Sequence, residues 1–238
     1  MPHRDGMTTS ANASSNAPLN APSHSTANAV RRRAGDPVPD LVTFLVFHSG
    51  LRRDFGRLAD ALDRCAPGDT RRRALIDEHT ALLLRALHHH HAGEDDDIWP
   101  LLRTLVPEAG PTLDHLEADH QEMDAVIGRL AATGADAAER ARDLRSLQTL
   151  LRAHLDLEEA EIVPLIREHI SAAQWDEIGR KVNKGQGRDL PMVAAWVVDV
   201  ASPEDREHIF ATAPAIMRVL YRLSWRRAYE RRMARVFG

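Results

Sequence analysis

The sequence predicts an all-α protein: an antiparallel, up-down four-helix bundle with extra helices at its C-terminal end. Three observations lead to this prediction. Four long stretches carry apolar residues at helical spacing, short segments containing Pro or Gly separate them, and no stretch shows the apolar–polar alternation of a strand. Because the connections are short, consecutive helices are expected to be antiparallel neighbours, which gives the up-down order.

The chain divides into three parts. Residues 1–36 are polar and Ala-rich with almost nothing to bury, and we expect a disordered tail there. Residues 37–170 are predicted to form the bundle, and residues 171–238 a C-terminal helical extension. Within the bundle, helices are expected at residues 40–66, 70–99, 112–132 and 136–170.

Local signals mark the ends of these helices. Asp40 precedes the first apolar run, as an N-cap does, and Pro67-Gly68-Asp69 is typical of a turn. Pro100 is expected to bend or break the end of the second helix, because proline lacks an amide hydrogen and clashes with the preceding turn. Residues 107–111 and Thr133-Gly134 supply the remaining breaks.

The composition excludes several classes of protein. Hydrophobic residues make up 43% and charged residues 28% of the 238, an ordinary balance for a soluble chain with a sizeable core. The formal net charge of −4 gives no support to nucleic-acid binding by the chain as a whole. The single cysteine, Cys65, excludes an intramolecular disulfide and a thiolate metal cage, and a cytoplasmic location is expected. No apolar run approaches the roughly 20 residues of a transmembrane helix.

An internal repeat contains the residues that indicate a function. The second and fourth predicted helices each contain a His followed by a Glu at +4 and a Pro at +10. These residues are His90, Glu94 and Pro100 in one helix and His154, Glu158 and Pro164 in the other. The first and third helices align as well, which places His48 opposite His120. The chain therefore consists of two copies of a helical hairpin, each with a lone His and a His-x-x-x-Glu.

These repeated residues are predicted to form a metal site. Residues four apart lie on one helix face, about 6 Å apart along the axis, and two hairpins related by a pseudo-twofold axis would bring the faces together. Buried imidazoles and carboxylates are costly unless they are paired or bind a metal. Such ligands without thiolate suit iron or manganese, with zinc as a further option, and two carboxylates can bridge ions about 3.5–4 Å apart. The candidate ligands are His48, His90, Glu94, His120, His154 and Glu158.

With these residues the chain resembles the hemerythrin-like family, also called HHE cation-binding domains, in its bacterial four-His, two-Glu form. The resemblance covers about residues 40–170 and rests on His48, His90-His91-Ala92-Gly93-Glu94, His120 and His154-Leu155-Asp156-Leu157-Glu158. It implies a non-haem centre of two iron ions joined by an oxo or hydroxo bridge, with manganese or zinc less favoured. The implied ligand is small: O2, NO or peroxide.

The resemblance leaves more than one function open. Reversible oxygen carriers have a second His four residues from the third-helix ligand, where this chain has Leu116 and Asp124, which argues against oxygen carriage. We expect the protein to sense or scavenge its small ligand, or to handle iron. The alternatives are a di-iron enzyme that reduces NO or disproportionates peroxide, and an iron-responsive interaction module. For an enzyme, Glu159 and His115 are the candidate proton donors.

The other histidines and acids have plainer interpretations. In the run His88-His89-His90-His91 we favour His90 as the ligand, because its +4 partner is Glu94; His91 with Asp95 is the rival. We expect His88, His89 and Asp95-Asp96-Asp97 to lie at the surface. His79 and His115 are expected either at the surface or next to the metal ligands.

The extension is predicted to be helical. Ser202 followed by Pro203 is typical of a helix start, and the last helix is expected at residues 213–236. This helix carries seven Arg against one acid, with an aromatic stripe at Tyr221, Trp225 and Tyr229. We expect it to pack on the bundle or form a dimer contact. An anionic membrane surface is the alternative, and nucleic acid or an acidic partner is the least favoured option.

Overall fold

The computed structural model describes residues 30–132 and 136–238. Most of the predicted tail at residues 1–36 and the predicted break at Thr133-Gly134 therefore lie outside the described residues. The part of the tail that is described contacts one end of the bundle. Arg31 donates a hydrogen bond to the Leu105 carbonyl (2.9 Å), and the backbone N–H of Arg32 donates to the His169 carbonyl (2.9 Å).

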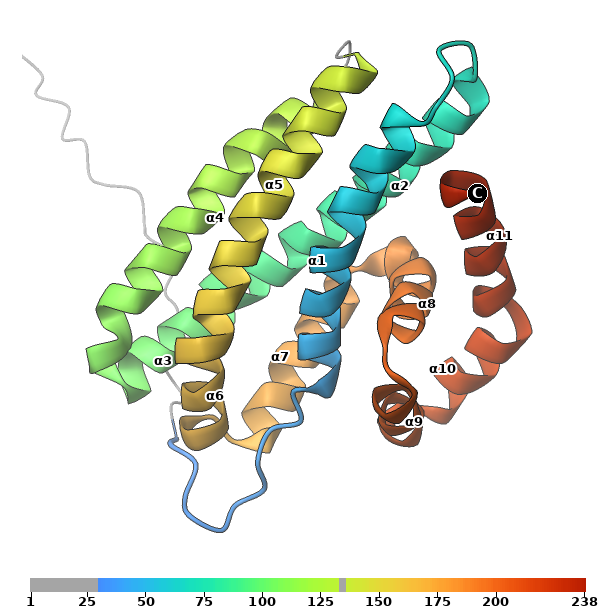
Figure 1. Ribbon diagram of the computed structural model, residues 1–238. Helices are drawn as coiled ribbons and strands as arrows, with labels where there is room; N and C mark the ends of the chain where they lie inside the picture. The colour runs from blue at the N-terminus through green and yellow to red at the C-terminus, as the bar shows by residue number, and fades with distance from the viewer. Residues whose placement is uncertain (1–29, 133–135) are drawn as a thin grey trace, which may run out of the picture.

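Four helical rods form the bundle, and the chain direction reverses from each rod to the next (Figure 1). The first and fourth rods lie side by side, as do the third and fourth. Over the described residues the secondary structure is helical, without strands, so the predicted all-α, up-down bundle with extra C-terminal helices is confirmed. The rods are α1 (Val42–Asp63), then α2 (Thr70–Gly93) with η1 (Glu94–Ile98) and α3 (Trp99–Leu105), then α4 (Gly110–Ala131), then α5 (Ala137–Leu157) with η3 (Glu158–Ile162) and α6 (Val163–His169).

The second rod continues through Pro100, which corrects the expected break. The turns η1 and η3 are π-helical, with backbone hydrogen bonds that reach five residues back: Trp99 donates to the Glu94 carbonyl and Val163 to the Glu158 carbonyl. A proline in an ordinary helical turn clashes with the carbonyl four residues before it. Each wide turn ends two residues before a proline, Pro100 or Pro164, and inserts one extra residue there. The helix can therefore accommodate the proline without ending.

Two apolar clusters fill the bundle on either side of a polar layer. One cluster includes Leu51 and Phe55, and the other includes Trp99 and Leu102; all four are at most 1% exposed. Along α4, His120 lies between Leu116 of one cluster and Met123 of the other. The polar layer is thereby shielded from water on both sides.

The extension curves around one side of the bundle (Figure 1). Its helices are α7 (Ala172–Gly185), α8 (Leu190–Val200), α9 (Pro203–Thr212), α10 (Ala215–Leu220), η5 (Tyr221–Trp225) and α11 (Arg226–Phe237). Ser202 caps α9 as predicted, by accepting a hydrogen bond from the backbone N–H of Asp205. The helix α8 packs on α1, and both α7 and α11 pack on α2. None of the helices in the described ranges is long and apolar enough to cross a bilayer.

A buried carboxylate joins the extension to the bundle. Asp54 on α1 is fully buried and accepts hydrogen bonds from Arg53 (2.8 Å), Arg57 (2.8 Å) and Trp196 Nε1 on α8 (2.7 Å). Arg53 also pairs with Asp199 at 2.9 Å. Burial by itself would raise the pKa of Asp54, but Arg53 lowers it below its usual value, so the group is a carboxylate at neutral pH. No sequence pattern indicated this network.

His79 corrects a second prediction. Instead of lying at the surface or beside the ligands, it is fully buried on α2, with its ring edge-on to Phe237 of α11 (6.0 Å between centroids). It precedes His90 by eleven residues, about three helical turns, and so lies on the same face of α2. Burial lowers the pKa of His79 to about 4, which makes the imidazole neutral at neutral pH.

Candidate metal centre

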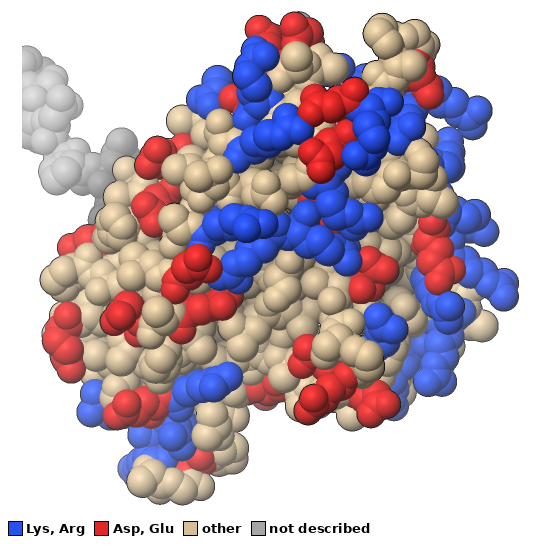
Figure 2. Space-filling view, viewed as in Figure 1, with Lys and Arg blue, Asp and Glu red and all other residues tan. Residues whose placement is uncertain are grey.

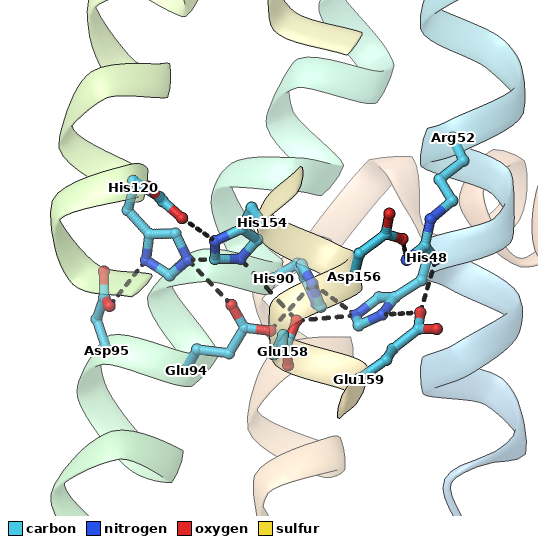
Figure 3. A network of polar contacts seen from close by, with 11 residues as sticks. His48, Arg52, His90, Glu94, Asp95, His120, His154, Asp156, Glu158 and Glu159 are labelled. Carbon is cyan, nitrogen blue, oxygen red and sulfur yellow. Dashed lines mark hydrogen bonds and ion pairs between the residues drawn. The ribbon is translucent and has the colours of Figure 1, made fainter. Parts of the chain in front are cut away.

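All six predicted residues meet at one level of the bundle, in the polar layer between the apolar clusters. Each rod contributes at least one of them, and no residue of the set is more than 7% exposed (Figure 3). Their imidazole Nε2 atoms and carboxylate oxygens point toward one another (Figure 3). The set comprises His48 of α1, His90 of α2, Glu94 of η1, His120 of α4, His154 of α5 and Glu158 of η3.

Together with His91, these residues form two clusters of four that share one member. Within each cluster, one ligand atom from every residue lies within 4.8 Å of the others. The first cluster contains His48, His90, Glu94 and Glu158; the second contains His91, Glu94, His120 and His154. Glu94 belongs to both clusters, so a single carboxylate joins the two groups of potential metal ligands.

The two carboxylates lie between the histidines of different rods. Glu94 Oε1 is 3.0 Å from His90 Nε2, and Glu94 Oε2 is 3.3 Å from His120 Nε2. Glu158 Oε2 is 3.5 Å from His48 Nε2 and 3.9 Å from His154 Nε2. In the described structure all four oxygens of Glu94 and Glu158 are buried without a hydrogen bond. Buried oxygens of this kind are costly unless a cation is bound between them, and the residues present therefore fit a metal site.

His91 is the residue that sequence analysis ranked too low. The structure buries both His90 and His91 and directs them to different clusters. The His91 ring stacks on His120 with 3.9 Å between centroids, and His91 Nε2 is buried without a hydrogen bond in the described residues. A signal was available: Glu94 follows His90 by four residues and His91 by three, and both spacings place side chains on one helix face.

Both carboxylates occupy the first position of a π-helical turn. Glu94 begins η1 and Glu158 begins η3, so the internal repeat extends to the backbone conformation. Such turns are rare and are found often at functional sites. The repeat in sequence thus corresponds to a structural device that occurs at the same place in each hairpin.

The residue after each of these glutamates holds a histidine of the other hairpin. His48 Nδ1 lies 2.9 Å from Glu159 Oε1, and His120 Nδ1 lies 2.9 Å from Asp95 Oδ1 (Figure 3). Arg52 in turn binds Glu159 at 2.6 Å. A carboxylate that accepts the Nδ1–H fixes the tautomer and aims Nε2 at the metal.

This arrangement corrects the interpretation of the acidic run. Asp96 is exposed as predicted, but Asp95 holds His120, and Asp97 pairs with Lys181 of α7 at 2.6 Å. Asp95 lies in the π-helical turn and reaches His120, although 37% of its side chain is exposed to solvent.

Without metal, the site favours neutral imidazoles at His48 and His154, a protonated imidazole at His120 and an ionised carboxylate at Glu159. Burial lowers the pKa of His48 and of His154 to about 4. Burial by itself would lower the pKa of His120 too, but its hydrogen bond to Asp95 and the nearby Glu94 carboxylate raise it to about 9. Burial opposes ionisation of Glu159, yet hydrogen bonds from His48 and Arg52 lower its pKa to about 2.

Neither predicted proton donor is available as one. With a pKa of about 2, Glu159 is a carboxylate at neutral pH, so it accepts the His48 proton rather than supplying one. His115 is exposed on α4 and outside both clusters. Neither of the two residues singled out from the sequence is therefore placed to give a proton to the clusters.

We expect the two outer carboxylates to control metal affinity. Glu159→Gln and Asp95→Asn should each weaken metal binding about 10–100-fold, because the amide cannot accept the imidazole proton as well. Asp96→Asn is the matched control, since Asp96 lies in the same turn and is exposed. Competition with a chelator under argon measures the affinities, and wild-type affinity in both variants would contradict this role.

Comparison with protein-family models matches residues 41–166 to a model described as "Hemerythrin HHE cation binding domain". The matched segment contains every residue of the two clusters and ends before the extension. Searches of curated proteins and of solved structures found no match for this chain.

Proposed function

Because the chain belongs to the hemerythrin HHE cation-binding domain family, we propose that it is a non-haem di-iron protein that binds O2, NO or peroxide. Its role would be sensing, scavenging or iron handling. The observation that carries the proposal is the pair of buried clusters that share Glu94. We further assign residues 37–170 to the metal-binding domain and residues 171–238 to an addition that shapes access to it. The cytoplasmic location stays a prediction.

The donor set supports two iron ions and an open coordination position. Imidazoles with carboxylates and no thiolate suit iron or manganese better than a structural zinc site. One cluster contributes two imidazoles and the other contributes three. Each cluster has four residues, so the ion held by His48 and His90 would have fewer imidazoles but as many protein ligands. We place the exogenous ligand at this ion because Phe44 and Phe47 lie against His48 and His90.

Aromatic side chains cover that position. The Phe44 ring centroid lies 4.2 Å from that of His48 and 5.3 Å from that of His90, and the Phe47 centroid lies 5.0 Å from that of His90. This apolar wall excludes bulk water and admits small uncharged molecules. When bound, iron supplies the redox and ligand-binding chemistry; the chain's own residues orient the imidazoles and keep the position dry.

Metal analysis combined with absorption spectra tests the proposal. Purified protein should contain about two iron ions per chain, in keeping with a two-metal site. Its near-ultraviolet spectrum in air should differ from that under argon, and NO or peroxide should change it again. A chain that holds a single zinc ion and rejects iron would overturn the proposal.

The outer face of the extension has the features of a surface that binds another molecule. Ile216, Val219, Leu220 and Leu223 recur at helical spacing and are 63%, 50%, 38% and 71% exposed. Exposed arginines follow on η5 and α11, and Figure 2 shows basic side chains along the edge of the molecule where α10 and α11 lie. A basic helix with an exposed apolar stripe complements an anionic lipid surface. We propose that this stripe binds anionic membranes.

Cosedimentation with phosphatidylserine vesicles tests the contact. We expect the wild type to bind these vesicles but not neutral phosphatidylcholine ones. Leu223→Asp should abolish the binding, while Val38→Asp, at a site 55% exposed and outside the stripe, should not. Failure of the wild type to bind would refute the lipid assignment. If the stripe instead joins two copies, gel filtration without lipid will show a dimer that Leu223→Asp dissociates.

A further inference from the structure

The first metal position, formed by the first cluster, has a carboxylate behind it that is paired with a cation. Glu159 holds His48, and Arg52 of α1 donates hydrogen bonds to Glu159 at 2.6 Å and to Asp156 at 2.7 Å (Figure 3). Arg52 is 23% exposed and Asp156 is 74% exposed, so water screens the charge of Asp156 the most. The guanidinium therefore offsets the negative charge of Glu159 beside this position.

The second metal position, formed by the second cluster, has two carboxylates behind it and no such cation. Asp95 lies 2.9 Å from His120 Nδ1, and Asp119 lies 3.4 Å from His154 Nδ1. In the described part of the chain, neither acid pairs with an Arg or Lys side chain. Asp95, Asp119 and Glu159 are similarly exposed, at 37%, 26% and 33%, so the guanidinium of Arg52 decides the difference between the two positions.

The repeat that relates the two hairpins is broken at the residues that set these charges. With the hairpins aligned, Arg52 corresponds to Asp124, so an acid stands in the second hairpin where the first has its cation. Phe47 corresponds to Asp119, so the first hairpin has an apolar ring where the second has a carboxylate. The repeat thus keeps the ligands and changes the charge around them.

The two inner carboxylates leave this difference in place. Glu94 and Glu158 each lie at most 3.9 Å from the Nε2 atom of one histidine in each cluster. The negative charge of each therefore acts on both positions. The difference in charge between the positions arises in the outer residues.

We propose that Arg52 is a positioning residue that makes the two metal positions unequal, so that the second position takes the more highly charged ion and the first the less highly charged one. The inference rests on the proposed di-iron function and adds an order of oxidation to it. A higher cation charge is favoured where negative charge is uncompensated, and burial of the clusters strengthens this effect. The second ion is then oxidised before the first, and the exogenous ligand binds at the ion that stays iron(II) longer.

A redox titration of the iron-loaded, full-length chain under argon tests the proposal. Dithionite reduces both ions to iron(II). Ferricyanide then takes one electron from the second ion and, at a higher potential, one electron from the first. The half-oxidised form, with one iron(II) and one iron(III), has an odd number of electrons and gives an electron paramagnetic resonance signal. We expect two separated potentials, with a strong signal between them.

Two charge variants should each move one of these potentials. Arg52→Gln removes the cation beside the first position, so it should lower mainly the upper potential. Asp119→Asn removes an anion beside the second position, so it should raise mainly the lower one. Both changes bring the potentials together and should reduce the equilibrium constant for forming the half-oxidised form about 10-fold or more, because a full unit charge is removed beside one position only.

Two further variants serve as controls. Arg52→Lys keeps the positive charge and should keep both potentials near those of the wild type. Arg145→Gln is the matched control: Arg145 also joins α5 to α1 through two acids, Asp60 and Asp63, but lies nine residues before His154, about 13 Å along the helix. A shift of the lower potential alone in Arg52→Gln, or unchanged potentials in both charge variants, would overturn the assignment.

Iron content, measured on the same preparations, separates this inference from the proposed function. If the wild type holds two iron ions whose potentials coincide, the inequality is wrong and the di-iron proposal stands. If the wild type does not hold two iron ions, both fall together. If Arg52→Gln loses an ion, Arg52 holds the ligands through geometry rather than charge, and the assignment is overturned as well.

Discussion

Replacing Glu94 with alanine should abolish binding of both metal ions, whereas His91→Ala should impair only one. The reason is geometric: Glu94 belongs to both clusters, while His91 belongs to the second alone. We expect near-zero iron in Glu94→Ala and about one tightly held ion per chain in His91→Ala. Metal analysis after desalting measures both. Glu122→Ala, an exposed position on α4, is the control that should keep the full metal content.

Bound metal is expected to reverse the sign of a stability effect at Glu158. Without metal, Glu158 is buried without a hydrogen bond, and burial together with the nearby Glu94 carboxylate raises its pKa. Glu158→Leu should therefore raise the melting temperature of the metal-free protein, because a buried polar group is replaced by an apolar one. In the presence of metal the same variant should be the less stable protein. Metal at about 1,000 times its dissociation constant stabilises a fold by about 4 kcal/mol, and the variant loses much of this.

These two measurements together distinguish a ligand from a structural residue. A residue that only packs the core would lower the stability of both forms. If Glu158→Leu destabilises the metal-free and the metal-loaded protein equally, or if Glu94→Ala retains two ions, the shared-carboxylate arrangement is wrong.

Replacing Asp54 with alanine should cost about 3–5 kcal/mol of unfolding free energy, the largest effect expected outside the metal centre. The substitution leaves Trp196 Nε1 buried without its acceptor, removes the ion-pair partner of Arg57 and leaves Arg53 with Asp199 alone. Urea unfolding measures the loss. Asp60→Ala is the control, because Asp60 lies on the same helix in an exposed ion pair with Arg145 and should cost less than about 1 kcal/mol.

The same network predicts a dependence on pH. The pKa of Asp54 is lower in the folded protein than in the unfolded chain. Its contribution is therefore present above the unfolded pKa of about 4 and is lost as the pH falls below that value. The gap in stability between the wild type and Asp54→Ala should thus shrink in acid. A gap that stays constant from neutral to acid pH would show that Asp54 stabilises the fold through packing rather than charge.

The internal repeat was sufficient to find most of the candidate site. His90 with Glu94, and His154 with Glu158, share a helix face because four residues make about one turn, and this relation is local to each helix. His48 and His120 followed from aligning the hairpins. His91 was underrated although its +3 spacing to Glu94 was visible. Asp95 was assigned to the solvated face because that prediction assumed an α-helical period of 3.6 residues per turn. In the structure the residue lies in a π-helical turn, which has a different period and so changes which residues reach the centre.

Periodicity along the chain thus determined the helices, their order and six of the seven residues in the two clusters. The contacts made by Asp54 and His79 were decided only when the extension folded back on the bundle. Each of these contacts joins or lies between elements far apart in sequence, and no spacing within one helix encodes which distant surface will cover it. Local hydrogen-bond geometry is repeated every turn and can be read from the sequence, whereas long-range packing depends on the shapes of all the side chains together.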